Sequence, residues 1–234
     1  MAVRAMPADA GNDRRNGLVE RMLRDIEREA RLTRHLIGRD DLSPRVMAAM
    51  RRVPRHAFVG AGMRAFAYDN GPLPIGHGQT ISQPYIVALM TDLIEPQPED
   101  EVLEVGTGSG YQAAILAELV RTVYSVEIIE ALASAAGERL AAQGYRNVLT
   151  RVGDGYQGWP EHGPYDGILV TAAAPHVPPP LVEQLKPGAR LVIPVGDPYR
   201  SQELIVVERH ADGSVSRRSV LPVAFVPLTG GHQS

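Results

Sequence analysis

Short apolar runs alternate with helical patterns through the second half of the chain, from Glu101 onward. The apolar runs lie near residues 102–105, 122–127, 147–152, 167–172 and 189–195. Apolar residues recur at helical spacing between them, near residues 110–120, 130–143 and 179–186. Strands that alternate with helices in this way are typical of a parallel sheet with helices on its faces. The pattern therefore predicts a doubly wound, mostly parallel α/β sheet.

The pattern changes after Pro194. Residues 201–209 alternate between apolar and polar side chains, as in a strand. Asp212-Gly213 is a common hairpin turn, and a second strand is predicted from about Ser214 to Val226. We therefore expect the sheet to end in an antiparallel hairpin.

The N-terminal part of the chain is predicted to be helical. Residues 1–16 are polar and aperiodic, so we expect a disordered tail there. Apolar residues recur at i+4 from Leu18 and predict an amphipathic helix to about His35. Ser43-Pro44 predicts the cap and first turn of a second helix, which ends before Pro54. We expect residues 17–83 to form a helical cover with a functional loop, and residues 84–234 to form the main domain.

The loop between Tyr68 and Pro84 is rich in glycine and proline. A loop of this length without periodicity is usually functional or disordered. Its apolar residues Leu73, Ile75 and Ile81 argue against disorder. We therefore expect a functional loop, followed by an apolar helix that begins at Pro84.

Composition narrows the possible functions. The net charge of −3 gives no general attraction to nucleic acid or to membrane surfaces. The chain has no cysteine, its seven histidines show no metal-ligand spacing, and no apolar run is long enough to span a membrane. The first 16 residues do not resemble a secretory signal. We expect a cytoplasmic monomer that holds no metal and binds neither nucleic acid nor membrane.

A glycine loop joins the first predicted strand of the main domain to the next helix. Glu104, Gly106, Gly108 and Gly110 form the pattern E-x-G-x-G-x-G. Tyr111 stands where a dinucleotide fingerprint needs its third glycine, the lysine of a nucleoside-triphosphate loop is missing, and the serine of the loop lacks the flanks of a nucleophile elbow. The pattern resembles motif I of class I methyltransferases that use S-adenosyl-L-methionine (AdoMet). A purely structural glycine turn is the alternative.

Two further acids follow the next two predicted strands. Glu127 lies 21 residues beyond Gly106, about where an acid accepts hydrogen bonds from both ribose hydroxyls of a nucleoside. Asp154 follows the third strand, at a position that contacts the adenine amino group in methyltransferases of this type. Three acids, each after a consecutive strand, favour a nucleoside site over a structural turn.

Three other segments identify a family. They are residues 75–84 (IGHGQTISQP), 170–175 (VTAAAP) and 225–229 (FVPLT). Together they resemble the protein-L-isoaspartate (D-aspartate) O-methyltransferases, and the resemblance covers roughly residues 42–231. It implies a Rossmann-like methyltransferase sheet with AdoMet as cofactor and S-adenosyl-L-homocysteine (AdoHcy) as product. It also implies that the free α-carboxylate of L-isoaspartyl and D-aspartyl residues in damaged proteins and peptides is methylated, which starts repair through a succinimide.

The resemblance also assigns site residues. Ser82 matches the active-site serine of the family. Cofactor contacts are implied for Gly76, His77, Gly78, Gln79, Glu104, Gly106, Gly108, Gly110, Glu127, Asp154, Gly155 and Thr229, and substrate contacts for Thr80, Ile81 and Val226. Ser82 could instead cap the helix that begins at Pro84. Ala224 departs from the longer, often basic side chain expected at the substrate edge, so a methyltransferase of the same fold that acts on an Asp of a dedicated peptide is an alternative. A non-catalytic AdoMet-binding protein is another.

Overall fold

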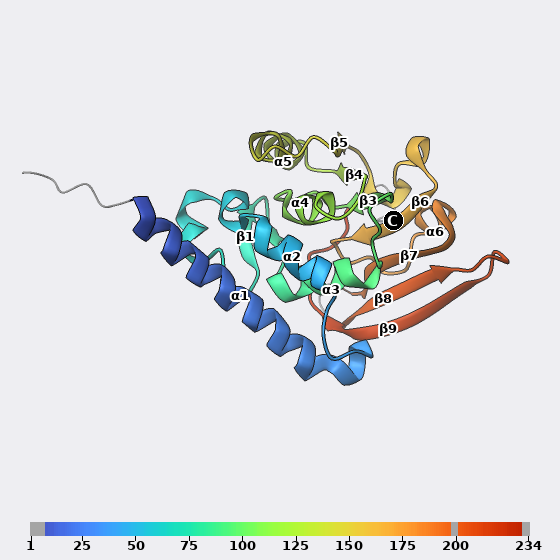
Figure 1. Ribbon diagram of the computed structural model, residues 1–234. Helices are drawn as coiled ribbons and strands as arrows, with labels where there is room; N and C mark the ends of the chain where they lie inside the picture. Colours follow the sequence, from blue (N-terminus) through green and yellow to red (C-terminus); the bar gives the residue numbers. More distant parts are fainter. Residues whose placement is uncertain (1–7, 198–200, 231–234) are drawn as a thin grey trace, which may run out of the picture.

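The computed structural model describes residues 8–197 and 201–230, and a seven-stranded sheet lies at its centre. The strands are β3 (Glu101–Val105), β4 (Thr122–Glu127), β5 (Val148–Val152), β6 (Tyr165–Val170), β7 (Leu185–Gly196), β8 (Gln202–Arg209) and β9 (Val215–Val223). Their order across the sheet is β5-β4-β3-β6-β7-β8-β9, from top to bottom in Figure 1. Strands β3 to β7 are parallel, and β8 and β9 are antiparallel to their neighbours. The predicted parallel sheet with a terminal antiparallel hairpin is confirmed.

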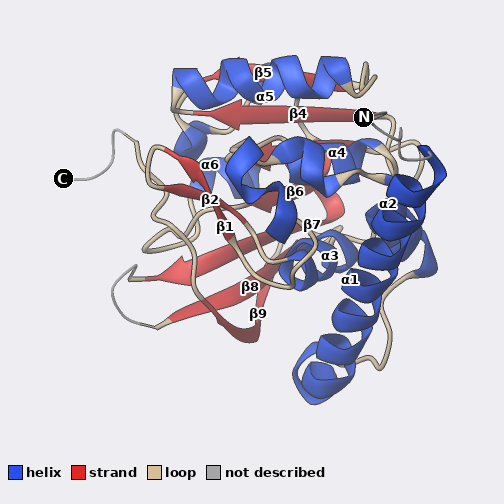
Figure 2. Ribbon diagram, turned by 90° about the vertical axis from the view of Figure 1, so that its left-hand side faces the viewer, coloured by secondary structure: helices blue, strands red, loops and turns tan. Residues whose placement is uncertain are grey.

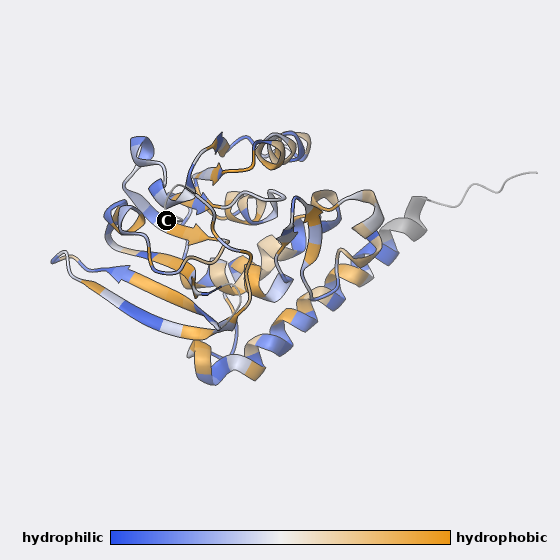
Figure 3. Cartoon of the chain, turned by 180° about the vertical axis from the view of Figure 1, so that it is seen from behind, coloured by the Kyte–Doolittle hydropathy of each residue, from blue (hydrophilic) through white to orange (hydrophobic). Residues whose placement is uncertain are grey.

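Hydrophobic clusters lie on both faces of the sheet. Val102 and Val123 belong to the cluster that the N-terminal helices cover, whereas Leu103 and Tyr124 belong to the cluster on the other face. Because successive side chains of a strand point to opposite faces, a strand covered on both sides is apolar throughout. Figure 3 shows the central strands as mostly hydrophobic, which explains why the sequence pattern identified them.

Helices connect the parallel strands. The α-helices of the main domain are α3 (Pro84–Leu93), α4 (Tyr111–Ala117), α5 (Glu130–Ala142) and α6 (Pro179–Glu183). Four short 3-10 helices are η1 (Arg55–Phe58), η2 (Ala61–Phe66), η3 (Gly155–Gln157) and η4 (Pro160–His162). Within residues 8–197 and 201–230, no helix is both long and apolar enough to cross a membrane.

Two further helices, α1 (Ala8–Ile37) and α2 (Pro44–Arg52), form the N-terminal cover. They lie close to α3 beside the sheet (Figure 2). Ser43 caps α2 by accepting a hydrogen bond from the amide of Arg45 (3.3 Å), as predicted. The prediction of a disordered tail is wrong for residues 8–16, which are helical, while residues 1–7 lie outside the described part. Adding residues to an existing helix costs little compared with starting one, so a polar stretch without a periodic apolar pattern can still be helical.

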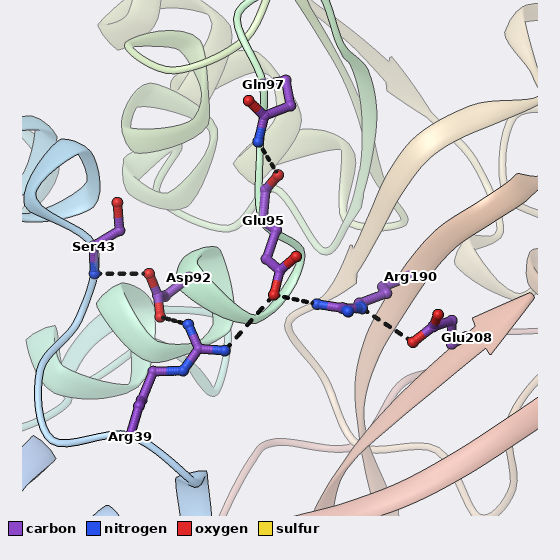
Figure 4. A network of polar contacts seen from close by, with 7 residues as sticks. All are labelled: Arg39, Ser43, Asp92, Glu95, Gln97, Arg190 and Glu208. Carbon is purple, nitrogen blue, oxygen red and sulfur yellow. Dashed lines mark hydrogen bonds and ion pairs between the residues drawn. The ribbon is translucent and has the colours of Figure 1, made fainter.

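A network of charged side chains attaches this cover to the sheet (Figure 4). Arg39, in the turn after α1, pairs with the buried carboxylate of Asp92 at 2.6 Å and with Glu95 at 3.7 Å. Arg190 of β7 pairs with the same Glu95 at 2.6 Å and with Glu208 of β8 at 3.3 Å. Glu95 therefore bridges an arginine of the cover and an arginine of the sheet.

The glycine-rich segment before α3 contains a short hairpin that the sequence analysis did not predict. Its strands are β1 (Leu73–Gly76) and β2 (Gln79–Ile81). His77 and Gly78 form the turn with φ of +53° and +71°, which is the backbone twist that two-residue hairpins favour. The strands are too short, and the proline within β1 too disruptive, for a period of two to stand out in the sequence. The hairpin fixes the position of Ser82, which follows it directly.

Candidate active site

A cleft opens at the carboxyl ends of β3, β4 and β6. Residues 79–82, 105–109, 126–129 and 226–229 line it, together with single residues that include Gly155 and Thr171. Ligands of open parallel sheets bind at this edge, where the strand order reverses direction along the chain. The glycine loop, the end of β4 and the β1–β2 hairpin therefore meet at the place where a nucleoside is expected.

The backbone of the glycine loop favours glycine at three positions, and at Gly106 there is also no space for a side chain. Gly106, Gly108 and Gly110 all have positive φ, at +97°, +53° and +88°. A Cβ atom on Gly106 would collide with the hydroxyl of Thr171. That hydroxyl donates a hydrogen bond to the Gly106 carbonyl at 2.7 Å. Glycine is required here for both backbone conformation and space, and Thr171 of the segment after β6 holds the loop in place.

Glu127 lines the cleft at the end of β4. Its Oε2 accepts a hydrogen bond from the amide of Gly108 at 2.8 Å, and its Oε1 accepts one from the amide of Ile129 at 3.0 Å. The side chain is only 6% exposed. These two amides orient the carboxylate and connect it directly to the glycine loop.

Glu104 lies beneath the loop and does not line the cleft. Its side chain is fully buried, and its Oε2 accepts a hydrogen bond of 2.5 Å from the hydroxyl of Ser125. Glu104 stands opposite Ser125 in the parallel register of β3 and β4, so the two side chains share a face. Burial raises the pKa of Glu104 to about 8, against the opposing effect of the Ser125 hydrogen bond. The structure thus places this acid in the interior, separate from Glu127.

The predicted cofactor residues divide into two groups. Those that line the cleft are Gln79, Gly106, Gly108, Glu127, Gly155 and Thr229. Those outside the lining are Gly76, His77, Gly78, Glu104, Gly110 and Asp154. Asp154 caps η3 by accepting a hydrogen bond from the amide of Tyr156 at 2.9 Å and lies against Gly230. Thr171 also lines the cleft, within the segment 170–175, although no sequence pattern assigned it a role.

A second groove, of about 460 Å³, adjoins the cleft. Residues 222–226 form one of its walls, and Thr80, Ser82, Thr171 and Val226 line both the groove and the cleft. Ser82 does not cap α3, because the cap position is Gln83 and no side chain bonds there. The alternative role of Ser82 as a helix cap is therefore wrong, and the residue lies where the two spaces meet.

The wall of the groove is held extended by a buried glutamine, which the sequence analysis did not identify. The side chain of Gln202, 3% exposed, accepts a hydrogen bond from the amide of Phe225 at 2.7 Å and donates one to its carbonyl at 3.0 Å. Further along, the amide of Ala173 donates to the carbonyl of Val226 at 2.8 Å, and the amide of Leu228 donates to the carbonyl of Ala173 at 2.7 Å. Two of the family-like segments, 170–175 and 225–229, are thus neighbours in space.

The sheet, the glycine loop and the acid at the end of β4 define a class I AdoMet-dependent methyltransferase. The family model described as protein-L-isoaspartate(D-aspartate) O-methyltransferase (PCMT) matches residues 27–233. The chain belongs to this family, so the resemblance found in the sequence is confirmed. It is an AdoMet-dependent enzyme that methylates L-isoaspartyl residues of proteins.

Individual relatives agree with this assignment. The chain is 65% identical to protein-L-isoaspartate O-methyltransferase 2 of Syntrophobacter fumaroxidans over 91% of this chain and 86% of that protein. It is 61% identical to the protein of the same name from Polaromonas sp., over 89% of this chain and 99% of that protein. A solved protein-L-isoaspartate O-methyltransferase matches with a TM-score of 0.79 and 27% identity, over 91% of this chain and 66% of its own. A Plasmodium falciparum structure in complex with AdoHcy shares the fold, with a TM-score of 0.72 and 24% identity. The match covers 92% of this chain and 97% of that one.

Proposed function

We propose that the groove holds the isoaspartyl residue and that Ser82 presents its α-carboxylate to the cleft, where AdoMet binds. The observation that carries this assignment is the junction of groove and cleft at Thr80, Ser82, Thr171 and Val226. A methyl donor and its acceptor must meet in a defined geometry, and this junction is shared by both spaces. D-aspartyl residues are proposed as a second substrate of the same site.

The residues of the cleft fit AdoMet. Gly106 and Gly108 of the glycine loop line the cleft without side chains, so the backbone there can come close to a ligand. The carboxylate of Glu127 is oriented by two amides and lines the cleft, where it would accept the ribose hydroxyls. Asp154 and Gly155 are proposed for the adenine, and Gln79 and Thr229 for closing over the cofactor. When bound, AdoMet supplies a methyl group on a positively charged sulfur.

The chain does not need a base for this chemistry. The free α-carboxylate of an isoaspartyl linkage has an ordinary pKa of about 3.5–4, so it is ionised at neutral pH. Among the described residues that line the cleft and the groove there is no histidine, and Glu127 is the single acid. We propose that the Ser82 hydroxyl donates a hydrogen bond that orients the carboxylate. Walls such as Ile81, Val226 and Leu228 exclude water from it, which makes an anion more reactive.

The peptide backbone is proposed to lie extended along residues 222–226. Gln202, which does not line the groove, forms hydrogen bonds with both the amide and the carbonyl of Phe225 and so keeps this wall extended. A wall of fixed backbone can distinguish the isomerised linkage from a normal one, because a peptide in the wrong register leaves polar groups unpaired. Since Ala224 adds no long side chain to the groove, selection would depend on backbone geometry. The methyl ester then closes to a succinimide without the enzyme, as the backbone nitrogen attacks the ester carbonyl and methanol leaves.

A direct test uses AdoMet with a labelled methyl group and two peptides that differ only in an isoaspartyl or aspartyl linkage. We expect kcat/KM to favour the isoaspartyl peptide by a factor on the order of 10³ or more. Peptides with proline or an N-methylated residue beside the site are expected to react more slowly, because they lack an N–H donor. Equal methylation of the aspartyl peptide would overturn the proposal in favour of an enzyme for a dedicated peptide.

We also propose that the enzyme acts as a monomer in the cytoplasm and does not bind nucleic acid. Edge strand β9 exposes Arg217 and Arg218, and charged side chains on an edge oppose pairing with a second sheet. The net charge of −3 gives no attraction to phosphate backbones. Light scattering, cell fractionation and a gel-shift assay would test the three statements separately.

A further inference from the structure

Arg55, at the start of η1, has a fully buried guanidinium group behind the active-site segment. Its Nε donates a hydrogen bond to the carbonyl of Ala67 at 2.8 Å. Its Nη2 donates to the carbonyl of Ser82 at 2.8 Å and, more weakly, to that of Gly71 at 3.4 Å. The group also lies over the ring of Tyr111, with 4.8 Å between Cζ and the ring centre.

This charge has no acidic partner within the described residues, and its Nη1 has no hydrogen-bond partner there. Burial lowers the pKa of Arg55, but an arginine side chain stays charged in proteins. A buried charge without a carboxylate costs stability, and carbonyl groups and an aromatic face offset that cost only in part. Packing alone therefore does not account for a charged group at this position.

The groups that Arg55 contacts belong to separate parts of the site. Ala67 and Gly71 lie in the irregular stretch that leads into the β1–β2 hairpin, and Ser82 leaves that hairpin. Tyr111 begins α4 directly after the glycine loop and lines the cofactor cleft. One rigid planar group thus connects the serine at the junction with the helix that carries the cofactor loop.

We propose that Arg55 is a positioning residue for methyl transfer, which holds the backbone of Ser82 in register with the glycine loop. The role rests on the proposed function of Ser82. The fork of the guanidinium fixes the Ser82 carbonyl, and the hydroxyl of the same residue is thereby directed to the junction. Arg55 touches neither cleft nor groove, so its effect passes through Ser82 and Tyr111.

Arg45 provides a matched control. Its Nη1 donates to the carbonyl of Pro96 at 2.9 Å and its Nη2 to that of Leu119 at 3.1 Å, so it also clamps main-chain carbonyls with a guanidinium. It joins α2 to the main domain, and neither it nor its partners line the cleft or the groove. The substitution R45Q therefore shows whether removing a guanidinium group that bonds main-chain carbonyls lowers activity merely by damaging the fold.

The experiment compares wild type, R55Q and R45Q at a temperature at which circular dichroism shows all three folded. We expect R55Q to lower kcat on the isoaspartyl peptide by about 10- to 100-fold while the Kd of AdoHcy, measured by calorimetry, changes by less than about threefold. R45Q is expected to keep the wild-type kcat. Wild-type kcat in R55Q, or an equal loss in R45Q, would overturn the role of Arg55.

Should R55Q not fold, R55K supplies the test, because lysine keeps the charge but lacks the planar fork. We expect R55K to have a reduced kcat with an unchanged KM for AdoMet, and a full kcat would overturn the proposal. The activity of the wild type shows whether a negative result concerns Arg55 or the proposed function on which its role rests. A wild type that does not methylate the isoaspartyl peptide contradicts the proposed function, whereas an active wild type with an unaffected R55Q contradicts the inference alone.

Discussion

Replacing Glu104 by glutamine is expected to remove a marked dependence of stability on pH. Glu104 is fully buried, and one of its carboxylate oxygens, Oε1, has no hydrogen-bond partner among the described residues. Burial raises the pKa of its carboxyl from an ordinary value of 4.5 to about 8. The unfolded chain releases this proton at a lower pH than the folded protein does, so the folded state binds more protons between these two values.

The sign and size of the effect follow from this difference. The contribution of Glu104 to the free energy of unfolding is fully present below pH 4.5 and is lost as the pH rises through about 8. At about 1.4 kcal/mol per pH unit, the complete loss is about 5 kcal/mol. Between about pH 5.5 and pH 8.5 the wild type should lose about 3 kcal/mol more than E104Q, because glutamine carries no charge at either pH.

Urea unfolding at these two pH values, followed by the fluorescence of the single tryptophan, Trp159, measures the difference. Titrating groups that do not interact with Glu104 affect both proteins equally and cancel in the comparison. Equal losses of stability in wild type and E104Q would refute the reasoning. Since Glu104 does not line the cleft, E104Q should also bind AdoHcy at pH 7 with nearly wild-type affinity.

Three further substitutions test the site. E127A should weaken AdoHcy binding by about 1–3 kcal/mol in calorimetry, since the ribose hydroxyls lose their acceptor; an unchanged affinity would count against that role. S82A should lower kcat and leave the Kd of AdoMet and the Tm near wild type, because its hydroxyl caps no helix; a lower Tm with full kcat would contradict it. Q202A should raise the KM for the isoaspartyl peptide, as the groove wall loses two hydrogen bonds at Phe225. Gln184 is the control, because it accepts a hydrogen bond of 2.9 Å from the amide of Trp159 and does not line the groove. An equal rise of KM in Q184A would argue against a specific role for Gln202.

Local patterns were enough to predict the sheet and the glycine loop. Strands buried on both faces must be apolar throughout, so their composition reveals them without knowledge of their neighbours. Positive φ and close approach at Gly106 restrict that position to glycine, so the requirement is visible in the letters of the chain. The family-like segments around them identified the enzyme, and the family comparison confirmed it.

Other features depend on contacts between distant parts of the chain. Glu104 and Glu127 look alike in sequence, each at the end of a strand, yet only Glu127 lines the cleft. Glu104 bonds instead to Ser125, which the strand register sets opposite it, and no local pattern encodes that partner. The helical state of residues 8–16 and the short β1–β2 hairpin were likewise missed, because polar composition and very short strands leave no periodic signal.

Arg55 and Gln202 illustrate the same limit most clearly. Arg55 meets the carbonyl of Ser82 across 27 positions of sequence, and Gln202 meets the backbone of Phe225 across 23. Both bond to main-chain atoms, which every residue type carries, so their partners leave no mark in the sequence. The role of such a side chain is decided by which backbone segment the tertiary structure brings to it.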